Sequence, residues 1–190
     1  MPRITSGKAK NRNIDIPEID NIRVAQDVYK MSLFAIIGDR IGDATCLDLF
    51  AGSGSFGLEA LSRGAKSCDF VDESRRACQT IKDNLKNTGL DGGEVFQEGA
   101  VKFAANTANT YDLVFMDPFY DDTKHKFLLK NLEEILNPNG VVAFSHGEGI
   151  HINEQIEGTN FKIDTERRFG RSYLTLLVVG LVSGLVSEQR

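Results

Sequence analysis

Short apolar runs alternate with segments of helical periodicity from residue 45 to about residue 179. This alternation is typical of parallel strands joined by right-handed crossover helices, which cover both faces of one sheet. We expect strands at 45–50, 68–72, 94–98, 112–117, 140–145, about 161–168 and 172–179. Helices are expected between them at 55–63, 75–88, 100–106 and 123–136. The pattern therefore predicts an α/β fold, in which ligands bind where the parallel strands end.

Local signals mark the ends of some of these elements. Ser74 is predicted to cap the helix over 75–88. The buried stripe of that helix is expected at Ala77, Ile81 and Leu85. The run Asn-Pro-Asn-Gly at 137–140 predicts a turn before the fifth strand.

The first 40 residues precede the alternation and have a different pattern. Two short strand-like pieces, 3–6 and 13–16, flank the run Gly-Lys-Ala-Lys, which predicts a hairpin or an extended arm. A helix ending at Gly38 is predicted from helical spacing at Val24, Val28, Met31 and Ala35. The expected parts are an N-terminal arm and helix over 1–40, a main domain over 41–180 and a tail over 181–190.

Composition is that of an ordinary globular protein, with 41% apolar and 26% charged residues in a chain of 190. The N-terminus has no apolar run typical of a signal peptide, and the apolar stretch 173–186 is too short to span a bilayer. We therefore expect a cytoplasmic protein. Three cysteines without Cys-x-x-Cys spacing favour buried, reduced thiols over a disulfide framework or a zinc site.

Charge is distributed unevenly along the chain. The net charge is −5, yet the first twelve residues contain four basic residues and no acidic residue, which leaves −9 on the remainder. A local basic patch can bind a polyanion even when the whole protein is acidic. Charge alone favours the simpler interpretation, a solvated arm.

A glycine-rich turn follows the first strand of the alternation. Gly52, Gly54 and Gly57 let the backbone approach a ligand closely, and Asp72 follows twenty residues after Gly52 at the end of the next strand. This spacing fits nicotinamide dinucleotides and S-adenosylmethionine alike. Asp48 favours the second, because a carboxylate before the turn repels a pyrophosphate but suits an ammonium and a sulfonium. Each acid alone could be a local cap, whereas their joint spacing favours a cofactor site.

A second motif, Asp117-Pro118-Phe119-Tyr120, ends the fourth expected strand. The Asp117 carboxylate and the Pro118 carbonyl can accept hydrogen bonds from an exocyclic amine and aim its lone pair at a methyl donor. Tyr120 can stack on an unstacked base. The tetrapeptide alone would indicate an ordinary loop. Its place after the acid and glycine turn favours methyl transfer to a base.

These motifs together resemble the bacterial 16S ribosomal RNA guanine-N2 methyltransferases, over nearly the whole chain from Arg3 to about Val179. The most specific segment is Leu-Asp-Leu-Phe-Ala-Gly-Ser-Gly at 47–54, which continues through 57–65. The resemblance also includes the segments 3–8, 23–37, 111–118 and 167–170.

The resemblance implies a Rossmann-like class I methyltransferase with a seven-stranded, mostly parallel sheet and no metal. It implies catalytic residues Asp117, Pro118 and Tyr120. The cofactor-binding residues that it implies for S-adenosylmethionine are Asp48, Phe50, Gly52, Gly54, Asp72 and Glu73. The RNA-binding residues that it implies are Arg3, Lys8, Lys10, Arg12 and Arg23. The expected partner is 16S rRNA in a partly assembled small subunit, bound by a monomer.

The chain departs from the family pattern at three positions, and other functions stay open. Phe119 replaces a second proline, Gly99 stands where an acid is expected with Glu98 beside it, and Ser145 replaces a glutamate before His146. One alternative is an adenine-N6 DNA methyltransferase, because the amine motif serves either base. Another is a catalytically weak RNA-binding assembly factor. An NAD-dependent oxidoreductase is the least favoured.

Overall fold

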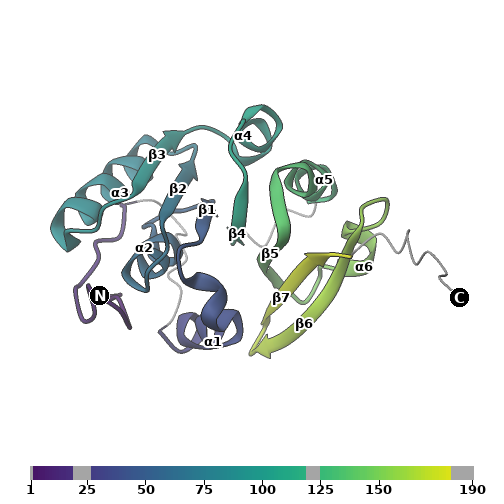
Figure 1. Cartoon of the computed structure of the whole chain (residues 1–190), viewed down its shortest axis with the longest axis horizontal. Helices are drawn as coiled ribbons and strands as arrows, with labels where there is room; N and C mark the ends of the chain where they lie inside the picture. The colour runs from purple at the N-terminus through teal and green to yellow at the C-terminus, as the bar shows by residue number, and fades with distance from the viewer. Residues whose placement is uncertain (1, 19–26, 119–124, 181–190) are drawn as a thin grey trace, which may run out of the picture.

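A seven-stranded sheet runs through the computed structural model, which describes residues 2–18, 27–118 and 125–180 (Figure 1). The strands are β1 (Thr45–Leu49), β2 (Ser67–Asp72), β3 (Gly93–Gln97), β4 (Tyr111–Met116), β5 (Leu136–Gly147), β6 (Phe161–Phe169) and β7 (Ser172–Val179). Their order in space is β3-β2-β1-β4-β5-β7-β6. Strand β7 is antiparallel to both of its neighbours, and the other pairs are parallel. The predicted fold class is therefore confirmed.

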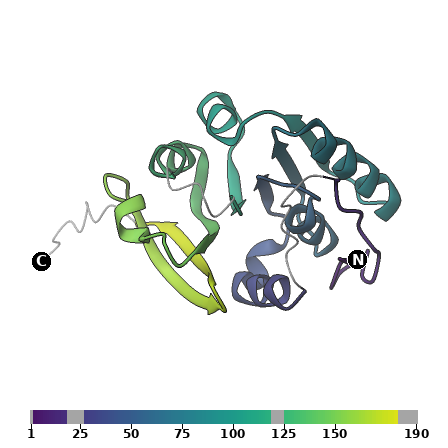
Figure 2. The same ribbon diagram turned by 180° about the vertical axis from the view of Figure 1, so that it is seen from behind.

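Helices cover both faces of the sheet, as Figures 1 and 2 show from opposite sides. The α-helices of the described residues are α1 (Asp27–Ile37), α2 (Ser55–Ser62), α3 (Arg75–Thr88), α4 (Ala100–Asn106), α5 (Lys126–Ile135) and α6 (Ile152–Gln155), and a 3₁₀ turn spans Gly38–Ile41. One buried apolar cluster includes side chains of α1, α2, α3 and the N-terminal arm. A second cluster includes those of α4, α5 and α6. None of these helices has the length and apolar character needed to cross a membrane.

Helix α3 forms as the pattern predicts. The Ser74 side chain caps it by accepting a hydrogen bond of 3.3 Å from the Ala77 N–H. Ala77 and Ile81 are buried, and Leu85 is partly buried against the same cluster. Gly89 ends the helix in the left-handed conformation, with φ of 68°.

One local prediction is confirmed and another is wrong. The helix predicted to end at Gly38 forms as α1, whose last residue is Ile37. Two of the residues at the predicted spacing face solvent, since Val28 is 68% and Met31 56% exposed; Val24 lies outside the described residues. The buried face of α1 consists of Lys30, Leu33, Phe34 and Ile37. Lys30 can be buried because its ammonium group is ion-paired with Glu59 inside the protein. The turn predicted at 137–140 lies inside β5, where the register shifts and Asn139 has φ of 66°. A local irregularity of the strand accommodates the turn-forming residues.

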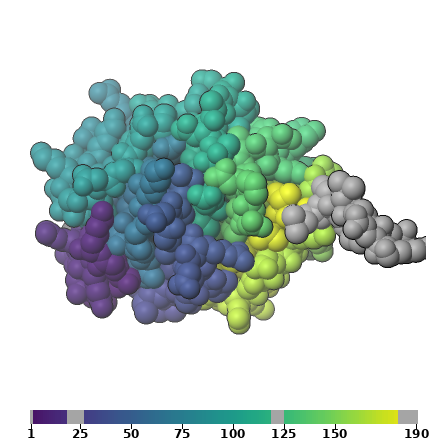
Figure 3. Space-filling model, viewed as in Figure 1, coloured from purple at the N-terminus to yellow at the C-terminus, as the bar shows by residue number. Residues whose placement is uncertain are grey.

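The N-terminal arm, residues 2–18, is packed onto the domain. Residues 3 and 13 form an antiparallel bridge, and Ile4 exchanges backbone hydrogen bonds with residues 11 and 12. Ile4 and Ile14 are fully buried. In the space-filling view the arm, in purple, lies against the first half of the chain, in blue and teal (Figure 3). The predicted hairpin therefore forms, and the arm is not a solvated tail.

Candidate functional site

The glycine turn, residues 50–54, connects β1 to α2 in an unusual backbone conformation. Phe50, Gly52 and Gly54 all have positive φ, of 57°, 55° and 76°. The turn is closed by a 2.7 Å hydrogen bond from the Gly54 N–H to the Ala51 carbonyl. The left-handed region costs a non-glycine residue such as Phe50 about 1–3 kcal/mol, and such strain concentrates at ligand sites. The turn therefore has the backbone geometry expected of a binding site.

Gly57 has a packing role rather than a role in the turn itself. A Cβ added at this position would lie 2.3 Å from Phe70 Cε1 and 2.6 Å from Cys68 Sγ. Only glycine lets α2 approach β2 this closely. The Gly57 N–H also donates a 2.9 Å hydrogen bond to Asp48 Oδ2.

Asp48 is a buried carboxylate beneath the glycine turn, with 2% of its surface exposed. Burial is the main cause that raises its pKa well above the ordinary value, and the Gly57 hydrogen bond opposes this rise. The carboxylates of Asp117 and Asp72 raise the pKa further. Strands β1 and β4 are parallel neighbours, with Asp48 opposite Phe115. The acids of the two motifs thus lie in one electronegative region, as the sequence predicted.

Asp72 connects the end of β2 to the glycine turn. Its Oδ2 accepts a 2.9 Å hydrogen bond from the Gly52 N–H, and its Oδ1 accepts a 2.8 Å bond from the Ser74 N–H. Each carboxylate oxygen has a second lone pair for a ligand hydroxyl. Asp72 can therefore hold the turn and a bound diol at once.

A carboxylate from another segment lies beside Gly99, where the family pattern has an acid. A Cβ on Gly99 would lie 4.0 Å from Glu73 Oε2. The Glu98 carboxylate is instead engaged by Lys102 in an ion pair of 2.6 Å. Glu73 is exposed and is therefore the carboxylate available at this position.

The second motif begins directly after β4. Asp117 is partly buried and Pro118 is buried. Phe119 and Tyr120 lie outside the described residues, as does the predicted RNA-binding residue Arg23.

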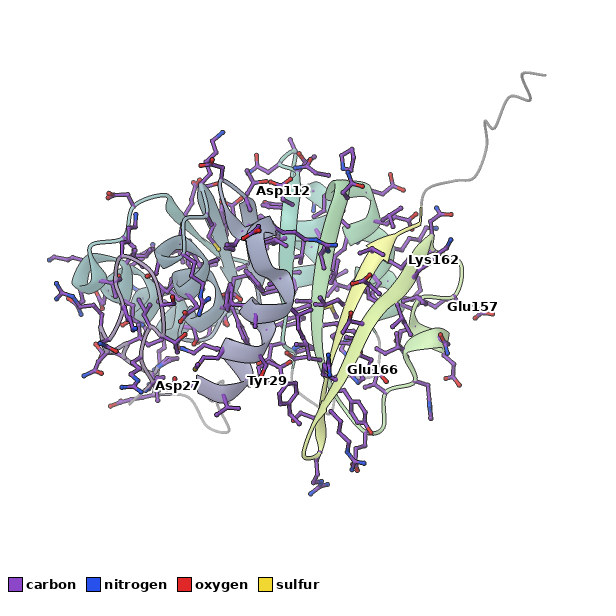
Figure 4. The ribbon with its side chains drawn as sticks, turned by 60° about the horizontal axis from the view of Figure 1, so that its bottom comes forward. Asp27, Tyr29, Asp112, Glu157, Lys162 and Glu166 are labelled. Atoms are coloured by element: carbon purple, nitrogen blue, oxygen red, sulfur yellow. The ribbon has the colours of Figure 1, made fainter. Side chains whose placement is uncertain are left out.

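Tyr29 of α1 makes contacts with distant elements that sequence reasoning missed. Its hydroxyl is hydrogen-bonded to Ser145 Oγ near the end of β5. The centroid of its ring lies 5.0 Å from the ring centroid of Phe169 on β6 and 6.1 Å from that of Phe56 on α2. Figure 4 shows Tyr29 at the end of the molecule that holds the tip of the β6–β7 hairpin, whereas Asp112 of β4 lies at the opposite end. The only sequence signal is that Tyr29 lies one turn before the buried Leu33.

The basic residues of the arm reach the surface. Lys8, Lys10 and Arg12 are exposed. The Arg3 side chain is 57% exposed and forms a 3.1 Å ion pair with Asp27. The arm therefore presents the predicted positive charge to solvent.

A buried ion pair beneath the arm fixes its position. Lys30 and Glu59 are fully buried, with Lys30 Nζ 3.7 Å from the Glu59 carboxylate and 2.5 Å from the Arg3 carbonyl oxygen. Burial lowers the pKa of Lys30, which the two neighbouring acids oppose. Glu59 also accepts hydrogen bonds from the Thr5 N–H at 2.8 Å and from Arg63 Nε at 2.8 Å. This pair joins α1, α2 and the arm.

Other chemistries have little support in the described residues. No cluster of three or more His, Cys, Asp or Glu residues in them could hold a metal ion. Cys46, Cys68 and Cys78 are free and buried, and burial raises the pKa of each thiol. This agrees with their interpretation as buried, reduced thiols.

Comparisons with known proteins agree with this geometry. The family model described as conserved hypothetical protein 95 matches residues 2–178. A Bacillus subtilis protein named "Putative rRNA methyltransferase YlbH" is 36% identical over 160 residues, covering 81% of this chain and 87% of that protein. The ribosomal RNA small subunit methyltransferase D of Escherichia coli is 33% identical over 141 residues, covering 74% of this chain and 69% of that enzyme.

A solved structure shows the same fold. The "Putative methyltransferase yhhF" of Escherichia coli superposes with a TM-score of 0.82 at 27% identity, covering 94% of this chain and 97% of that one. The strand order, with its single antiparallel strand β7, is therefore that of a methyltransferase sheet.

Proposed function

Because this chain belongs to the conserved hypothetical protein 95 family, with small-subunit rRNA methyltransferases among its relatives, we propose that it methylates the exocyclic N2 of a guanine in 16S rRNA, with S-adenosylmethionine as donor. One observation carries the proposal. Asp48 lies on β1 and Asp117 directly follows the neighbouring parallel strand β4, close enough for the charge of Asp117 to raise the pKa of Asp48. A cationic donor and an amine acceptor can therefore meet between them.

The residues around the glycine turn fit the cofactor. Asp48 supplies the negative charge that suits its ammonium and sulfonium groups, and the cation offsets the cost of burying this carboxylate. The positive-φ backbone of Phe50, Gly52 and Gly54 admits close approach. Asp72 accepts the ribose hydroxyls.

Glu73 is the carboxylate that we assign to the adenine of the cofactor. Glu73, beside Gly99, lines the place where the base would lie. This assignment makes Glu73, and not Glu98, the residue that compensates for Gly99, since Glu98 is engaged by Lys102.

An orphaned hydroxyl marks the opposite end of the cofactor. Ser55 Oγ is buried and has no hydrogen-bond partner in the described part of the chain. It lies in the first turn of α2, where unpaired backbone N–H groups and the helix dipole favour an anion. The carboxylate of the cofactor's methionine moiety would satisfy this hydroxyl.

The residues of the second motif bind the guanine and orient its exocyclic amine. When bound, the cofactor would supply an electrophilic methyl group, whose bond to sulfur would break as the bond to the guanine nitrogen forms. Asp117 and the Pro118 carbonyl accept the two N–H groups of the guanine amine, which directs the nitrogen lone pair toward the methyl group. As the nitrogen becomes positive, its proton passes to Asp117, directly or through water. Tyr120 stacks on the base.

The arm provides the affinity for RNA. Arg3, Lys8, Lys10 and Arg12 carry positive charge on a protein that is otherwise acidic, so this face attracts the RNA backbone. The family resemblance adds Arg23 to this set of RNA-binding residues. We place the reaction in the cytoplasm, on a partly assembled small subunit, and expect a monomer to perform it.

The proposal is tested by substituting Asp117. Asp117→Asn keeps an acceptor but removes the charge and the proton acceptor, so the methylation rate on small subunits from cells that lack this enzyme should fall at least about 100-fold. Affinity for S-adenosylhomocysteine, measured by calorimetry, should change less than about twofold. Asp164→Asn, on the exposed face of β6, is the matched control.

Nucleoside mass spectrometry of the product identifies the substrate. N2-methylguanosine in 16S rRNA is the expected product. Methyl transfer to plasmid DNA alone would favour the adenine-N6 alternative. Absence of cofactor binding would favour the assembly-factor alternative, which the departures at Phe119 and Gly99 motivate.

A further inference from the structure

Asn84 of α3 is a buried amide with contacts to two distant segments, and its side chain is 1% exposed. Its Nδ2 donates to the Ser53 carbonyl at 3.0 Å and to the Asp15 carbonyl at 3.0 Å. Its Oδ1 accepts from the Asp15 N–H at 2.8 Å. One side chain therefore bonds to the glycine turn and, twice, to the backbone of the arm.

The identity of the residue fits this role. The three contacts need two donors and one acceptor at the end of a short side chain, which only asparagine supplies. Aspartate would place acceptors opposite two carbonyls. Alanine would remove all three bonds and leave the buried Ser53 carbonyl without this donor.

The segments that Asn84 joins have different tasks in the proposed function. Ser53 lies between Gly52 and Gly54, whose backbones are the least restricted in the turn, so a bond to the Ser53 carbonyl limits the conformations available there. Asp15 belongs to the arm that carries the basic residues. The arm continues along α3, where Arg76 Nη1 donates a 2.9 Å bond to the Glu18 carbonyl.

The arm is thus held against both helices that flank the glycine turn. At α2 it is attached through Glu59 and through Ser62, whose Oγ accepts from the Ala9 N–H at 2.9 Å. At α3 it is attached through Asn84. Figure 3 shows the arm lying on this part of the surface.

We propose that Asn84 is a positioning residue that couples RNA binding on the arm to cofactor binding at the glycine turn. The inference rests on the proposed function. RNA that holds the arm in place stabilises the Asn84 contacts and hence the binding conformation of the turn. By linkage, bound cofactor strengthens RNA binding by the same factor.

The test is equilibrium dialysis of labelled S-adenosylhomocysteine, with and without small ribosomal subunits from cells that lack this enzyme. In the wild type the subunits should tighten cofactor binding about fivefold or more. In Asn84→Ala and Asn84→Asp, affinity without subunits should fall about tenfold and the effect of subunits should disappear. Gln79→Ala, an exposed change on the same helix, should keep the wild-type affinity without subunits and the wild-type tightening by subunits.

The ratio of the two affinities separates coupling from a merely structural role. If Asn84→Ala weakens binding but keeps the wild-type ratio, the inference is overturned. Should the Asn84 variants fail to fold, Arg76→Ala removes an exposed contact of the same arm segment and should lower the ratio in part; an unchanged ratio would then overturn the inference.

The outcomes also separate this inference from the proposed function. A wild-type protein that binds no S-adenosylhomocysteine would contradict the proposed function itself. A wild-type protein that methylates the subunit, but binds S-adenosylhomocysteine equally with and without it, would overturn the coupling alone.

Discussion

At the scale of single residues, Asp48 shows how a site can oppose stability. Its carboxylate is buried, receives one hydrogen bond from Gly57 and lies near two further acids. The raised pKa means that the folded protein without ligand disfavours the ionised form. Under the proposed function, a bound cationic ligand would reverse this preference.

We predict that the affinity for S-adenosylmethionine rises with pH as Asp48 ionises. The ionised carboxylate attracts the cation, so binding lowers the Asp48 pKa and releases a proton. Calorimetry between pH 5 and 7 should show this rise in the wild type. In Asp48→Asn, which keeps the acceptor for Gly57, binding should be about tenfold weaker and nearly independent of pH. The same pH slope in both proteins would contradict the assignment.

Asp48 also leads to a prediction about stability, which should fall with rising pH whereas ligand affinity rises. Because folding raises the pKa of Asp48, ionisation of this carboxylate destabilises the folded protein. The penalty is absent below the pKa of the unfolded state, about 4, and grows as pH rises through the pKa of the folded state. Asp48→Asn should therefore increase the free energy of unfolding at pH 7, by on the order of 1 kcal/mol. Urea denaturation without ligand measures this. Lower stability in the variant would show that the carboxylate supports the fold.

At the scale of elements, the arm behaves as a docked hairpin whose position depends on one glycine. Gly7 has φ of 81°, and a Cβ there would lie 1.8 Å from the Ser62 carbonyl oxygen. The neighbouring Lys8 N–H donates a 2.8 Å hydrogen bond to the same oxygen. Any side chain at this position would lift the arm from α2.

We predict that Gly7→Ala reduces affinity for small ribosomal subunits about tenfold or more, because the basic residues lose their fixed position. The free energy of unfolding should fall by about 1–3 kcal/mol. Filter binding and urea denaturation measure the two effects. Gly42→Ala is the control, since Gly42 has an ordinary φ of −61° and the nearest atom to its Cβ would lie at 3.7 Å. Equal RNA affinity of the two variants would argue against the arm as the RNA contact.

At the scale of the whole molecule, the antiparallel β6–β7 hairpin is tied to the parallel sheet through buried polar groups. His146 of β5 lies 3% exposed, with Nε2 2.9 Å from Thr175 Oγ1 and Nδ1 3.1 Å from the Gly147 carbonyl. Thr175 in turn donates a 3.0 Å hydrogen bond to Glu166 of β6. Burial lowers the pKa of His146, while Gly147 and Glu166 oppose this change.

We predict that His146 makes the protein less stable in mild acid. With a lowered folded-state pKa, the unfolded chain binds the proton first as pH falls below about 6.5, so stability decreases through that range. Between pH 7.5 and 5.5 the wild type should lose on the order of 1 kcal/mol more than His146→Gln. Urea denaturation at the two pH values measures the difference. Parallel losses would show that His146 does not titrate differently on folding.

The sequence by itself determined the sheet and the place of the candidate acids on it. Alternating apolar runs and helical periods are local properties, and Asp48, Gly52 and Asp72 are tied to strand ends by their spacing. Because parallel strands share one carboxyl edge, the meeting of Asp48 and Asp117 followed from the order of elements alone.

Only the tertiary structure decided which side chains are buried beside that edge. Periodicity could not reveal that Lys30 faces inward while Val28 and Met31 face solvent, because a buried Lys30 requires Glu59 from another helix. Nor could it reveal Tyr29 against Ser145, or Asn84 between Ser53 and Asp15, since these contacts join segments 31 to 116 residues apart. Hydrogen bonds between distant segments have no sequence period, so only the packed chain specifies them.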